Sequence, residues 1–494
     1  MLPLKRGFSP GLTTINPVSS INDTIVAIST PPGRGGIGIV RLSGPAARTF
    51  AEPMLRLRHP LAAAQARFGE VIDTASQQRL DDAVATWFAA PHSYTSEDVV
   101  EIATHGAPVV LDAVVRQALA AGARLAHPGE FTERAFLSGR MDLTQAEAVR
   151  DLIEAQTLQQ ARIAAQQMEG SLAKLIRPTK ESLVALIAAL EAGIDFAEDD
   201  IAVMPAASIA EKIAAVQKPL KALADSFAYG RVVRDGLTLA IVGRPNAGKS
   251  SLFNCLVERD RAIVTATPGT TRDLVTETIS LGGIPVRLVD TAGLRTAVDE
   301  AESMGIEKSR EALADADVVL LVLDATQPAN EEEQRLMETL VARPSVVVAN
   351  KCDLVSQGTG IREQGTGSFG GSVGFQPHET EFKKAGPLGP ENFVKTSALT
   401  GEGIAELREA ILLLVQSGPQ SAETALLTNL RQQQAVQAAL EGLAAAQTAI
   451  TENIPHEMLL LDIYSALRGL DALTGETTAD DVLNLIFSTF CIGK

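Results

Sequence analysis

The sequence predicts a multidomain protein that combines α/β units with an all-α region. The chain has 494 residues, which exceeds the usual size of one domain. Residues 21–138 and 235–415 alternate short apolar runs with turn signals, whereas residues 139–234 and 416–494 show helical periodicity. Because helical sequence lies on both sides of the second α/β unit, we expect that unit to be inserted in the helical domain, with its two ends close together.

Turn signals divide the first α/β unit into strands and a helix. The runs IVAIS, GIVRLS, AVATWFAA and DVVEIATH are typical of strands, and residues 108–122 are typical of a helix closed by Gly122. Residues 1–20 predict a disordered extension; a targeting peptide is the alternative, because they are acid-free and rich in Ser and Thr. Residues 356–391 are rich in Gly and Pro and predict a flexible insertion.

The composition narrows the classes of function. Lys and Arg total 43 against 60 Asp and Glu, and the net charge of −17 gives no sign of a large basic face for nucleic acid. If the protein acts on RNA, a local basic patch or a partner protein must bind the RNA. Three cysteines in this length exclude a disulfide framework and indicate a reducing compartment. No apolar run reaches the roughly 18–20 residues that cross a bilayer. We therefore expect a cytoplasmic protein that is not associated with a membrane.

The segment from Gly243 to Ser250, GRPNAGKS, matches a phosphate-binding loop. An apolar strand over residues 237–243 precedes it and a helical segment follows, which is the context that this motif needs. The glycines allow backbone N–H groups to surround the β-phosphate. Lys249 supplies a positive charge to the β- and γ-phosphates, and the Ser250 hydroxyl can bind Mg²⁺.

Further motifs follow in the order of a Ras-like P-loop GTPase domain. ATPGTTRD offers Thr271 as a second Mg²⁺ ligand, and VRLVDTAGL ends a strand at Asp290, whose carboxylate fits the outer Mg²⁺ shell. In the Asn-Lys-x-Asp motif, Asp353 can accept two hydrogen bonds that guanine donates and adenine cannot. Ser397 begins the loop over the base. The residues predicted to bind GTP are Gly243, Asn246, Ala247, Gly248, Lys249, Ser250, Ser251, Thr265, Thr270, Thr271, Asp290, Thr291, Ala292, Gly293, Asn350, Lys351, Asp353, Ser397 and Ala398.

A residue that many GTPases use for hydrolysis is absent. Leu294 stands where a Gln orients the attacking water, and a Leu side chain cannot do so. Either hydrolysis is very slow, or another group supplies the catalysis. Arg244, Arg272 and Arg295 lie near the motifs, but we interpret each as a solvated loop residue.

Segments outside these motifs carry a family resemblance. Residues 23–44, 93–106, 127–149 and 194–201 are similar to successive segments of one family, and the chain ends in FCIGK, which has the form of that family's Cys-x-Gly-Lys tail. Together with the GTPase motifs they span about residues 21–494 in the family's order. The chain therefore resembles the MnmE (TrmE) family of tRNA-modification GTPases.

The resemblance implies partners and cofactors. Members of the family are homodimers that act with the flavoprotein MnmG, in a heterotetramer in which FAD belongs to the partner. Together they add an aminomethyl or carboxymethylaminomethyl group to carbon 5 of the wobble uridine of certain tRNAs, and we expect the partner to hold most of the tRNA. The N-terminal domain binds 5-formyl- or methylene-tetrahydrofolate and mediates dimerisation. The GTPase domains are activated by pairing, with K⁺ where an arginine finger would act.

The resemblance also implies roles for individual residues. Glu302 matches the glutamate that positions the attacking water, although by spacing alone it is a solvated acid at a helix start. The residues that match the K⁺ shell are Asn246, Thr265, Thr267 and Thr270. The residues that match the tetrahydrofolate site are Arg41, Glu101, Arg140 and Lys494. Arg140 replaces a Lys that is more common in the family, and the two side chains differ in geometry.

Cys491 in the tail is a third candidate for catalysis beside Lys249 and Glu302, and a small buried residue at a domain interface is the alternative. Two other functions stay open. A ribosome-assembly or regulatory GTPase would carry the same motifs, but it predicts a basic RNA-binding appendage, and no such signature is evident. A scaffold would use GTP hydrolysis to time a conformational change. The sequence also does not show whether ammonium or glycine is the donor in the tRNA modification that the resemblance implies.

Overall fold

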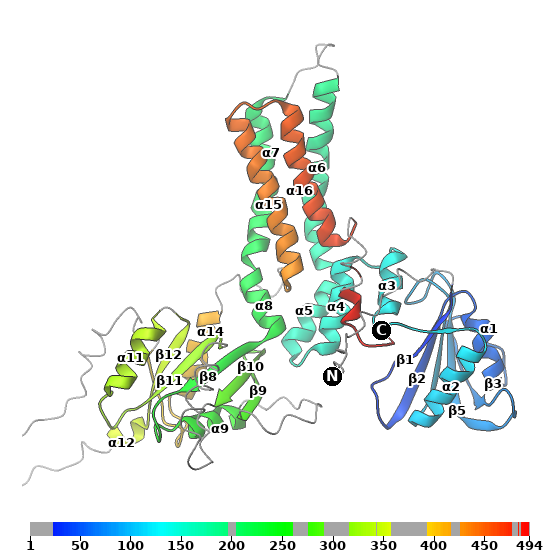
Figure 1. Cartoon of the computed structure of the whole chain (residues 1–494), viewed down its shortest axis with the longest axis horizontal. Helices are drawn as coiled ribbons and strands as arrows, with labels where there is room; N and C mark the ends of the chain where they lie inside the picture. The colour runs from blue at the N-terminus through cyan, green and yellow to red at the C-terminus, as the bar shows by residue number, and fades with distance from the viewer. Residues whose placement is uncertain are drawn as a thin grey trace, which may run out of the picture. The chain divides into compact units, whose positions relative to one another are not determined.

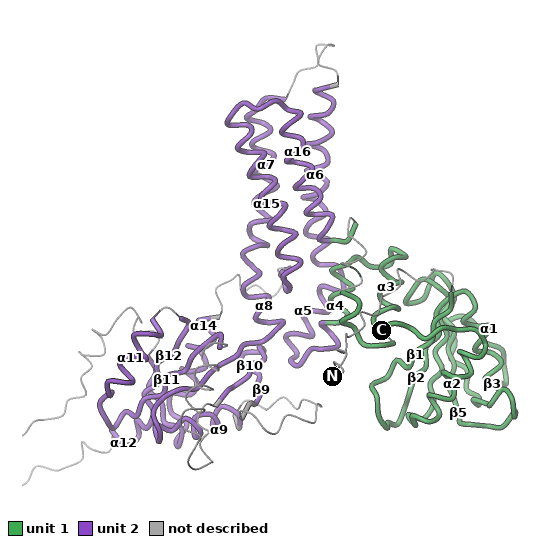
Figure 2. The backbone as a smooth tube through the Cα atoms, in the orientation of Figure 1, with its two compact units in different colours: residues 1–150, 474–494 green, residues 151–473 purple. Residues whose placement is uncertain are grey.

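The two α/β stretches form two separate sheets in the computed structural model, which confirms the multidomain α/β and all-α class. The structure describes residues 23–195, 204–259, 275–290, 316–341, 343–356, 393–415, 425–476, 483 and 486–493. The predicted extension over residues 1–20 and the predicted insertion from residue 357 onward lie outside them. Residues 1–150 with 474–494 form one compact unit, and residues 151–473 form the other (Figure 2).

The first unit is built on a seven-stranded sheet in the order β3-β4-β5-β6-β2-β1-β7 (Figure 1). All neighbouring strands are antiparallel except β1 and β7. The strands are β1 (Ile25–Ile28), β2 (Gly35–Ser43), β3 (Leu55–Leu57), β4 (Ala66–Ile72), β5 (Arg79–Phe88), β6 (Val99–Gly106) and β7 (Arg124–Leu125). The four runs predicted as strands correspond to β1, β2, β5 and β6, and they are confirmed.

Helices bury one face of this sheet. They are α1 (Ala47–Ala51), the 3₁₀ helix η1 (Glu52–Met54) and α2 (Pro108–Ala120). Helix α2 starts with Pro108 at its first position, where the missing N–H costs nothing. Gly38 of β2 permits its close approach, because a Cβ there would lie 2.6 Å from the Leu111 side chain. The helix predicted over residues 108–122 is thus confirmed.

The end of the chain belongs to this first unit. Helix α3 (Glu130–Leu137) places Phe131 against the face of β1 that carries Ile25 and Ala27. Next to it, α4 (Leu143–Glu154) forms an apolar cluster with the C-terminal segment. The buried members of that cluster are Leu143, Ala146, Val149, Leu483, Phe487 and Phe490. The tail of the chain therefore packs beside the N-terminal sheet, whereas the domain limits predicted at residues 138, 234 and 415 stay predictions.

The sheet of the second unit has six strands in the order β13-β12-β11-β8-β10-β9. The strands are β8 (Leu237–Val242), β9 (Val275–Leu281), β10 (Ile284–Asp290), β11 (Val318–Asp324), β12 (Ser345–Asn350) and β13 (Phe393–Lys395). Strand β9 pairs antiparallel with β10, and the other pairs are parallel. Every residue of β11 and β12 is buried, as in a parallel strand covered on both faces. The helices around it are α9 (Lys249–Arg259), α11 (Glu331–Leu340), α12 (Cys352–Ser356) and α14 (Ile404–Val415).

Four long helices of the second unit lie side by side as a bundle (Figure 1). They are α6 (Ser171–Asp195), α7 (Ala206–Asp225), α15 (Leu430–Thr451) and α16 (His456–Thr474). Glycines let α15 and α16 approach closely: a Cβ on Gly442 would lie 2.7 Å from the Ala466 backbone, and one on Gly469 would lie 2.8 Å from the Ala439 backbone. Two shorter helices, α5 (Leu158–Met168) and α8 (Phe227–Asp235), lie near the six-stranded sheet.

The chain enters and leaves the six-stranded sheet at neighbouring points, as an inserted domain requires. Helix α8 leads into β8, and the Leu427 N–H donates a hydrogen bond of 3.1 Å to the Ser226 hydroxyl just before α8. A Cβ on Gly230 would lie only 2.1 Å from the Leu427 carbonyl oxygen. In the described part of the chain, none of the helices has the length and apolar character to cross a membrane.

Candidate functional site

The described parts of the predicted nucleotide motifs lie at one edge of the six-stranded sheet. Strands β8, β10, β11 and β12 are parallel, so their carboxyl ends point the same way. Asp290 pairs with Ile241 at the end of β8, and Asp324 pairs with Asn350. Ligands of open α/β sheets bind outside the carboxyl ends of the strands. The phosphate loop, which starts at Gly243, lies at that edge.

The phosphate loop adopts backbone conformations that few side chains allow. Gly243 has φ 146°, and a Cβ there would lie 2.2 Å from the Val322 carbonyl oxygen. Gly248 has φ 94°, and a Cβ there would lie 2.2 Å from Asn350 Nδ2. Asn246 is left-handed at φ 62° and exposed at the turn of the loop. The glycines therefore permit both the curvature of the loop and its close contact with Asn350 of the Asn-Lys-x-Asp motif.

Lys249 lies inside the phosphate loop. Its side chain is buried, and Nζ donates hydrogen bonds to the carbonyl oxygens of Gly243 at 2.8 Å and Arg244 at 2.9 Å. A buried ammonium group needs such partners. The loop thus holds one positive charge at the N-terminus of α9, where the helix dipole also favours an anion.

Asn350 joins the phosphate loop to the loop over the base. Its Nδ2 donates to the Ala247 carbonyl oxygen at 3.0 Å, and its Oδ1 accepts from the Ala398 N–H at 3.1 Å and the Thr396 hydroxyl at 3.3 Å. The residue is 2% exposed. Because the buried side chain makes all three contacts, it acts as a fixed link between the phosphate loop and the loop that is predicted to lie over the base.

Asp324 is a site residue that the sequence reasoning missed. It ends β11, and its carboxylate lies 2.7 Å from Lys351 Nζ, so it holds the Lys of the Asn-Lys-x-Asp motif in place. Burial alone would raise the pKa of Asp324, but hydrogen bonds from Lys351 and Thr326 outweigh it and hold the pKa below its usual value. The sequence signal that could have identified Asp324 is its position directly after the apolar run VVLLVL.

The other predicted nucleotide residues are partly described. Ser250 and Ser251 are exposed on the first turn of α9, Asp353 is half-buried in α12, and the buried Ser397 accepts a hydrogen bond of 3.2 Å from the Thr400 N–H. Only the backbone of Asp290 is described. The predicted residues that lie outside the described part are Thr265, Thr267, Thr270, Thr271, Thr291, Ala292, Gly293, Glu302 and Lys494.

The interpretation of Arg244 as a solvated residue was wrong. Its Nε lies 3.4 Å from Glu333 Oε1, and the two side chains are 17% and 4% exposed. Glu333 also completes the capping box at the start of α11 with Asn330. An ion pair between the phosphate loop and the first turn of α11, which lie far apart in the sequence, gave no local signal.

A second cluster of predicted residues lies in the first unit. Arg41 on β2 faces Glu101 on β6 directly across the strands. Arg41 Nε donates to Glu101 Oε1 at 2.9 Å, and Nη2 lies 2.7 Å from the same oxygen. The guanidinium carbon also lies 5.7 Å from the centre of the Tyr94 ring and 5.6 Å from that of Phe131. The structure therefore brings two of the four predicted tetrahydrofolate residues together.

The tail reaches this pair. The Gly493 carbonyl oxygen accepts hydrogen bonds from Arg41 Nη1 at 3.4 Å and from the Ser29 hydroxyl at 3.1 Å. Cys491, the third predicted catalytic residue, is exposed with a free thiol. Arg140 donates to the Ser93 carbonyl oxygen, beside Tyr94. Ser29 and Tyr94 were not predicted, because nothing in their own sequence context marks them.

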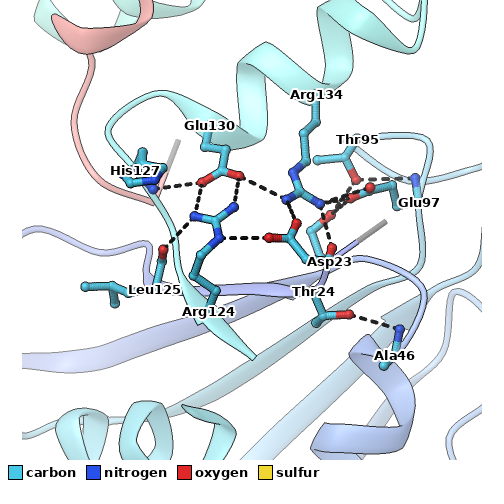
Figure 3. Close-up of polar contacts among 11 residues, drawn as sticks. Asp23, Thr24, Ala46, Thr95, Glu97, Arg124, Leu125, His127, Glu130 and Arg134 are labelled. Atoms are coloured by element: carbon cyan, nitrogen blue, oxygen red, sulfur yellow. Dashed lines mark hydrogen bonds and ion pairs between the residues drawn. The ribbon is translucent and has the colours of Figure 1, made fainter. Parts of the chain in front are cut away.

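Beside this cluster is a network of charges whose central residues, Arg134 and Glu130, are buried (Figure 3). Arg134, 5% exposed, contacts the carboxylates of Asp23, Glu97 and Glu130. Arg124 also contacts Asp23 and Glu130, so two guanidinium groups serve three carboxylates. Burial would raise the pKa of Glu130, but hydrogen bonds from Arg124, the His127 N–H and Arg134 outweigh it and lower the pKa. The sequence reasoning missed this network as well.

The phosphate loop, its buried lysine and the base-side motif define a P-loop nucleotide-binding protein of the G-domain class. Residues 24–140 match the family model for the GTP-binding protein TrmE N-terminus, and residues 143–491 match that for the MnmE helical domain. The chain belongs to the MnmE (TrmE) family. It is 58% identical over 479 residues to the tRNA modification GTPase MnmE of Koribacter versatilis, covering 96% of this chain and 100% of the relative.

Two more distant proteins are also similar. The tRNA modification GTPase MnmE of Aquifex aeolicus is 41% identical over 475 residues, which cover 96% of this chain and 100% of the relative. Among solved structures, the G domain of the T. maritima FeoB iron transporter is 25% identical and has a TM-score of 0.25, covering 36% of this chain and 99% of that chain.

Proposed function

We propose that the chain is a GTPase that acts in tRNA modification. With a flavoprotein partner of the MnmG type, it would install a carboxymethylaminomethyl or aminomethyl group at carbon 5 of the wobble uridine. The observation that supports nucleotide binding is the Asn350 link, whose buried side chain joins the phosphate loop to the base loop. The tRNA part is supported by membership of a family whose relatives are named tRNA modification GTPases.

The described residues fit GTP with Mg²⁺. Gly243 and Gly248 let the phosphate loop pack closely against Val322 and Asn350, and Lys249 holds a positive charge among loop carbonyl oxygens. The Ser250 hydroxyl, at the start of α9, would bind Mg²⁺ together with Thr271, and Asp290 would support that shell. When bound, Mg²⁺ neutralises charge on the phosphates. Asp353 and Lys351 would then select guanine, with Asp324 holding the lysine.

Hydrolysis needs a group in place of the missing Gln. Asn246 lies exposed at the turn of the phosphate loop, where its side-chain oxygen can bind K⁺. A monovalent cation there would offset charge that develops between the β- and γ-phosphates. We assign Thr265, Thr267 and Thr270 to the same shell and Glu302 to the attacking water.

The first unit would bind a one-carbon tetrahydrofolate and form the homodimer. Glu101 is a carboxylate that is 27% exposed and fixed by Arg41, so it can accept hydrogen bonds from pterin N–H groups. Arg140 and Lys494 would contribute cations. The Cys491 thiol, two residues before the Gly493 contact with Arg41, would take part in substrate handling.

The potassium proposal is tested by GTP hydrolysis of the full chain in KCl and NaCl at equal ionic strength. We expect faster turnover in KCl for the wild-type protein and loss of that stimulation in Asn246→Ala. Asn453→Ala is a matched control, because Asn453 is also an exposed left-handed asparagine, at φ 55°, and lies just after α15 of the bundle. Potassium stimulation that persists in Asn246→Ala would contradict the assignment of Asn246 as a K⁺ ligand.

A further inference from the structure

Tail residues 491–493 contact the rest of the first unit mainly through their backbone. The Gly129 N–H donates to the Cys491 carbonyl oxygen at 3.4 Å, and Ile492 forms an antiparallel bridge with Pro128. The Gly493 carbonyl oxygen is the next contact, with Ser29 and Arg41. Because backbone groups make these contacts, the side chains of Cys491 and Ile492 stay exposed.

Gly493 is buried and tolerates no side chain. Its φ is 94°, and a Cβ there would lie 2.4 Å from the Ile28 carbonyl oxygen and 3.0 Å from Ser29 Cα. The tail backbone therefore lies directly against the end of β1. The position is set by shape as well as by hydrogen bonds.

Arg41 serves both the tail and Glu101. Its Nε and Nη2 engage Glu101, while Nη1 reaches the Gly493 carbonyl oxygen. A guanidinium group can do this because it presents five N–H donors in a fixed plane. The rings of Tyr94 and Phe131 lie beside that plane and hold it in place.

The opposite contact point of the tail is also fixed. Pro128 and Gly129 lie in a loop whose His127 N–H donates to Glu130 Oε2 at 2.8 Å (Figure 3). Glu130 is in turn held by Arg124 and Arg134. The buried network of charges thus orders one support of the tail, and the Arg41–Glu101 pair orders the other.

We propose that Arg41 and Ser29 are positioning residues that latch the tail, and that this latch keeps the Cys491 thiol at a fixed place near the Arg41–Glu101 pair. The latch rests on the proposed function only in taking that pair as the tetrahydrofolate site. Since Arg41 is shared, a ligand held by Glu101 and docking of the tail must influence each other reciprocally. A bound ligand that orders Glu101 and Arg41 would keep the tail closed for longer.

The test is the rate at which carboxypeptidase Y trims the full chain past Gly493, followed by intact mass. Trimming requires the tail to leave its site, because Gly493 is buried. Removing one hydrogen bond in Ser29→Ala should raise the rate about threefold to tenfold. Ser29→Thr, which keeps a hydroxyl, should trim near the wild-type rate. Arg41→Lys should trim faster than Ser29→Ala, because an ammonium group cannot hold both partners in a plane.

Thr30→Val is the matched control. Thr30 is the next residue, and its hydroxyl accepts from the Ile39 N–H at 3.2 Å within the sheet. It should leave the trimming rate unchanged. Urea unfolding, followed by fluorescence of the single tryptophan Trp87 on β5, separates a local latch from general weakening. We expect the midpoint of Ser29→Ala to match that of the wild type.

Trimming of Ser29→Ala at the wild-type rate, or faster trimming that only accompanies a lower urea midpoint, would overturn the latch. A saturating concentration of 5-formyltetrahydrofolate should slow trimming of the wild type. If equilibrium dialysis shows no binding of that folate, the proposed folate site fails, whereas the result for Ser29→Ala still decides the latch.

Discussion

The nucleotide site and the tail site differ in how far apart in the sequence their parts lie. Asn350 reaches back 103 residues to Ala247, and its partners Thr396 and Ala398 lie within 48 residues of it. The Ser29 contact with Gly493 spans 464 residues. The first site is a set of loops on one parallel sheet, so each motif is recognisable alone. The second exists only once both ends of the chain meet.

The two sites also differ in how their cations are used. Lys249 donates to the carbonyl oxygens of Gly243 and Arg244 in the phosphate loop, where a phosphate would bind. Arg41 and Arg134 are paired with carboxylates and fix the protein itself. We therefore expect substitutions at the two sites to affect different properties, and the following changes test that separation from the largest expected effect to the smallest.

Arg134→Met should damage the first unit and spare the nucleotide site. It leaves Asp23 and Glu130 with Arg124 as their cation and Glu97 with the Ser43 hydroxyl, and removing one partner of a buried ion network costs about 3–5 kcal/mol. Urea unfolding at Trp87 measures the loss. Arg79→Met, which breaks half-exposed pairs with Glu70 and Asp82, should cost less than about 1 kcal/mol.

The affinity for a fluorescent GTP analogue should stay within about twofold in both of these variants, because the network is part of the first unit. Equal losses of stability in Arg134→Met and Arg79→Met would mean that the buried network does not hold the first unit together.

Lys249→Ala should have the reverse effect. Loss of a positive charge aimed at the phosphates lowers kcat for GTP hydrolysis by about 10²–10³-fold, by analogy with removal of one transition-state donor. The urea midpoint at Trp87 should not move. Lys221→Ala on the exposed face of α7 is the control. Retention of more than a tenth of the activity would contradict the role of Lys249.

Asp353→Asn should weaken guanine recognition. Exchange of a carboxylate for an amide removes charge-assisted hydrogen bonds worth about 1.5–3 kcal/mol, which is roughly a 10–150-fold loss of GTP affinity. Xanthosine triphosphate should lose less affinity, because its carbonyl group can accept from the amide. If GTP binds Asp353→Asn as tightly as the wild type, Asp353 does not read the base.

Acid should weaken the first unit. The pKa of Glu130 lies below its ordinary value of 4.5, and that of Asp23 lies below 3.8. A carboxylate whose pKa is lower in the folded protein than in the unfolded protein stabilises the folded state. That stabilisation is complete above the pKa of the unfolded protein, and it is lost as the pH falls through the pKa of the folded protein. The urea midpoint at Trp87 should therefore drop below about pH 4.5, and it should drop less steeply in Arg134→Met. Parallel curves for the two proteins would argue against this origin.

Residues that lie next to each other in the chain made the fold and the nucleotide site predictable. GRPNAGKS and NKCD each carry their chemistry within a few residues, and strand periodicity placed them at the sheet edge. Asp324 needed only the rule that a residue at the carboxyl end of a buried parallel strand lies at the ligand edge of the sheet. By contrast, Ser29, Tyr94 and the partners of Arg134 act through contacts across the fold, and no spacing in the sequence encodes those.

The central claim, that this GTPase acts in tRNA modification, is tested most directly by mass spectrometry of tRNA nucleosides from cells with and without the gene. We predict that 5-aminomethyl-type wobble uridines disappear on deletion, return with the intact gene and do not return with Lys249→Ala. An unchanged nucleoside profile on deletion would contradict the account and leave a GTPase with a different output.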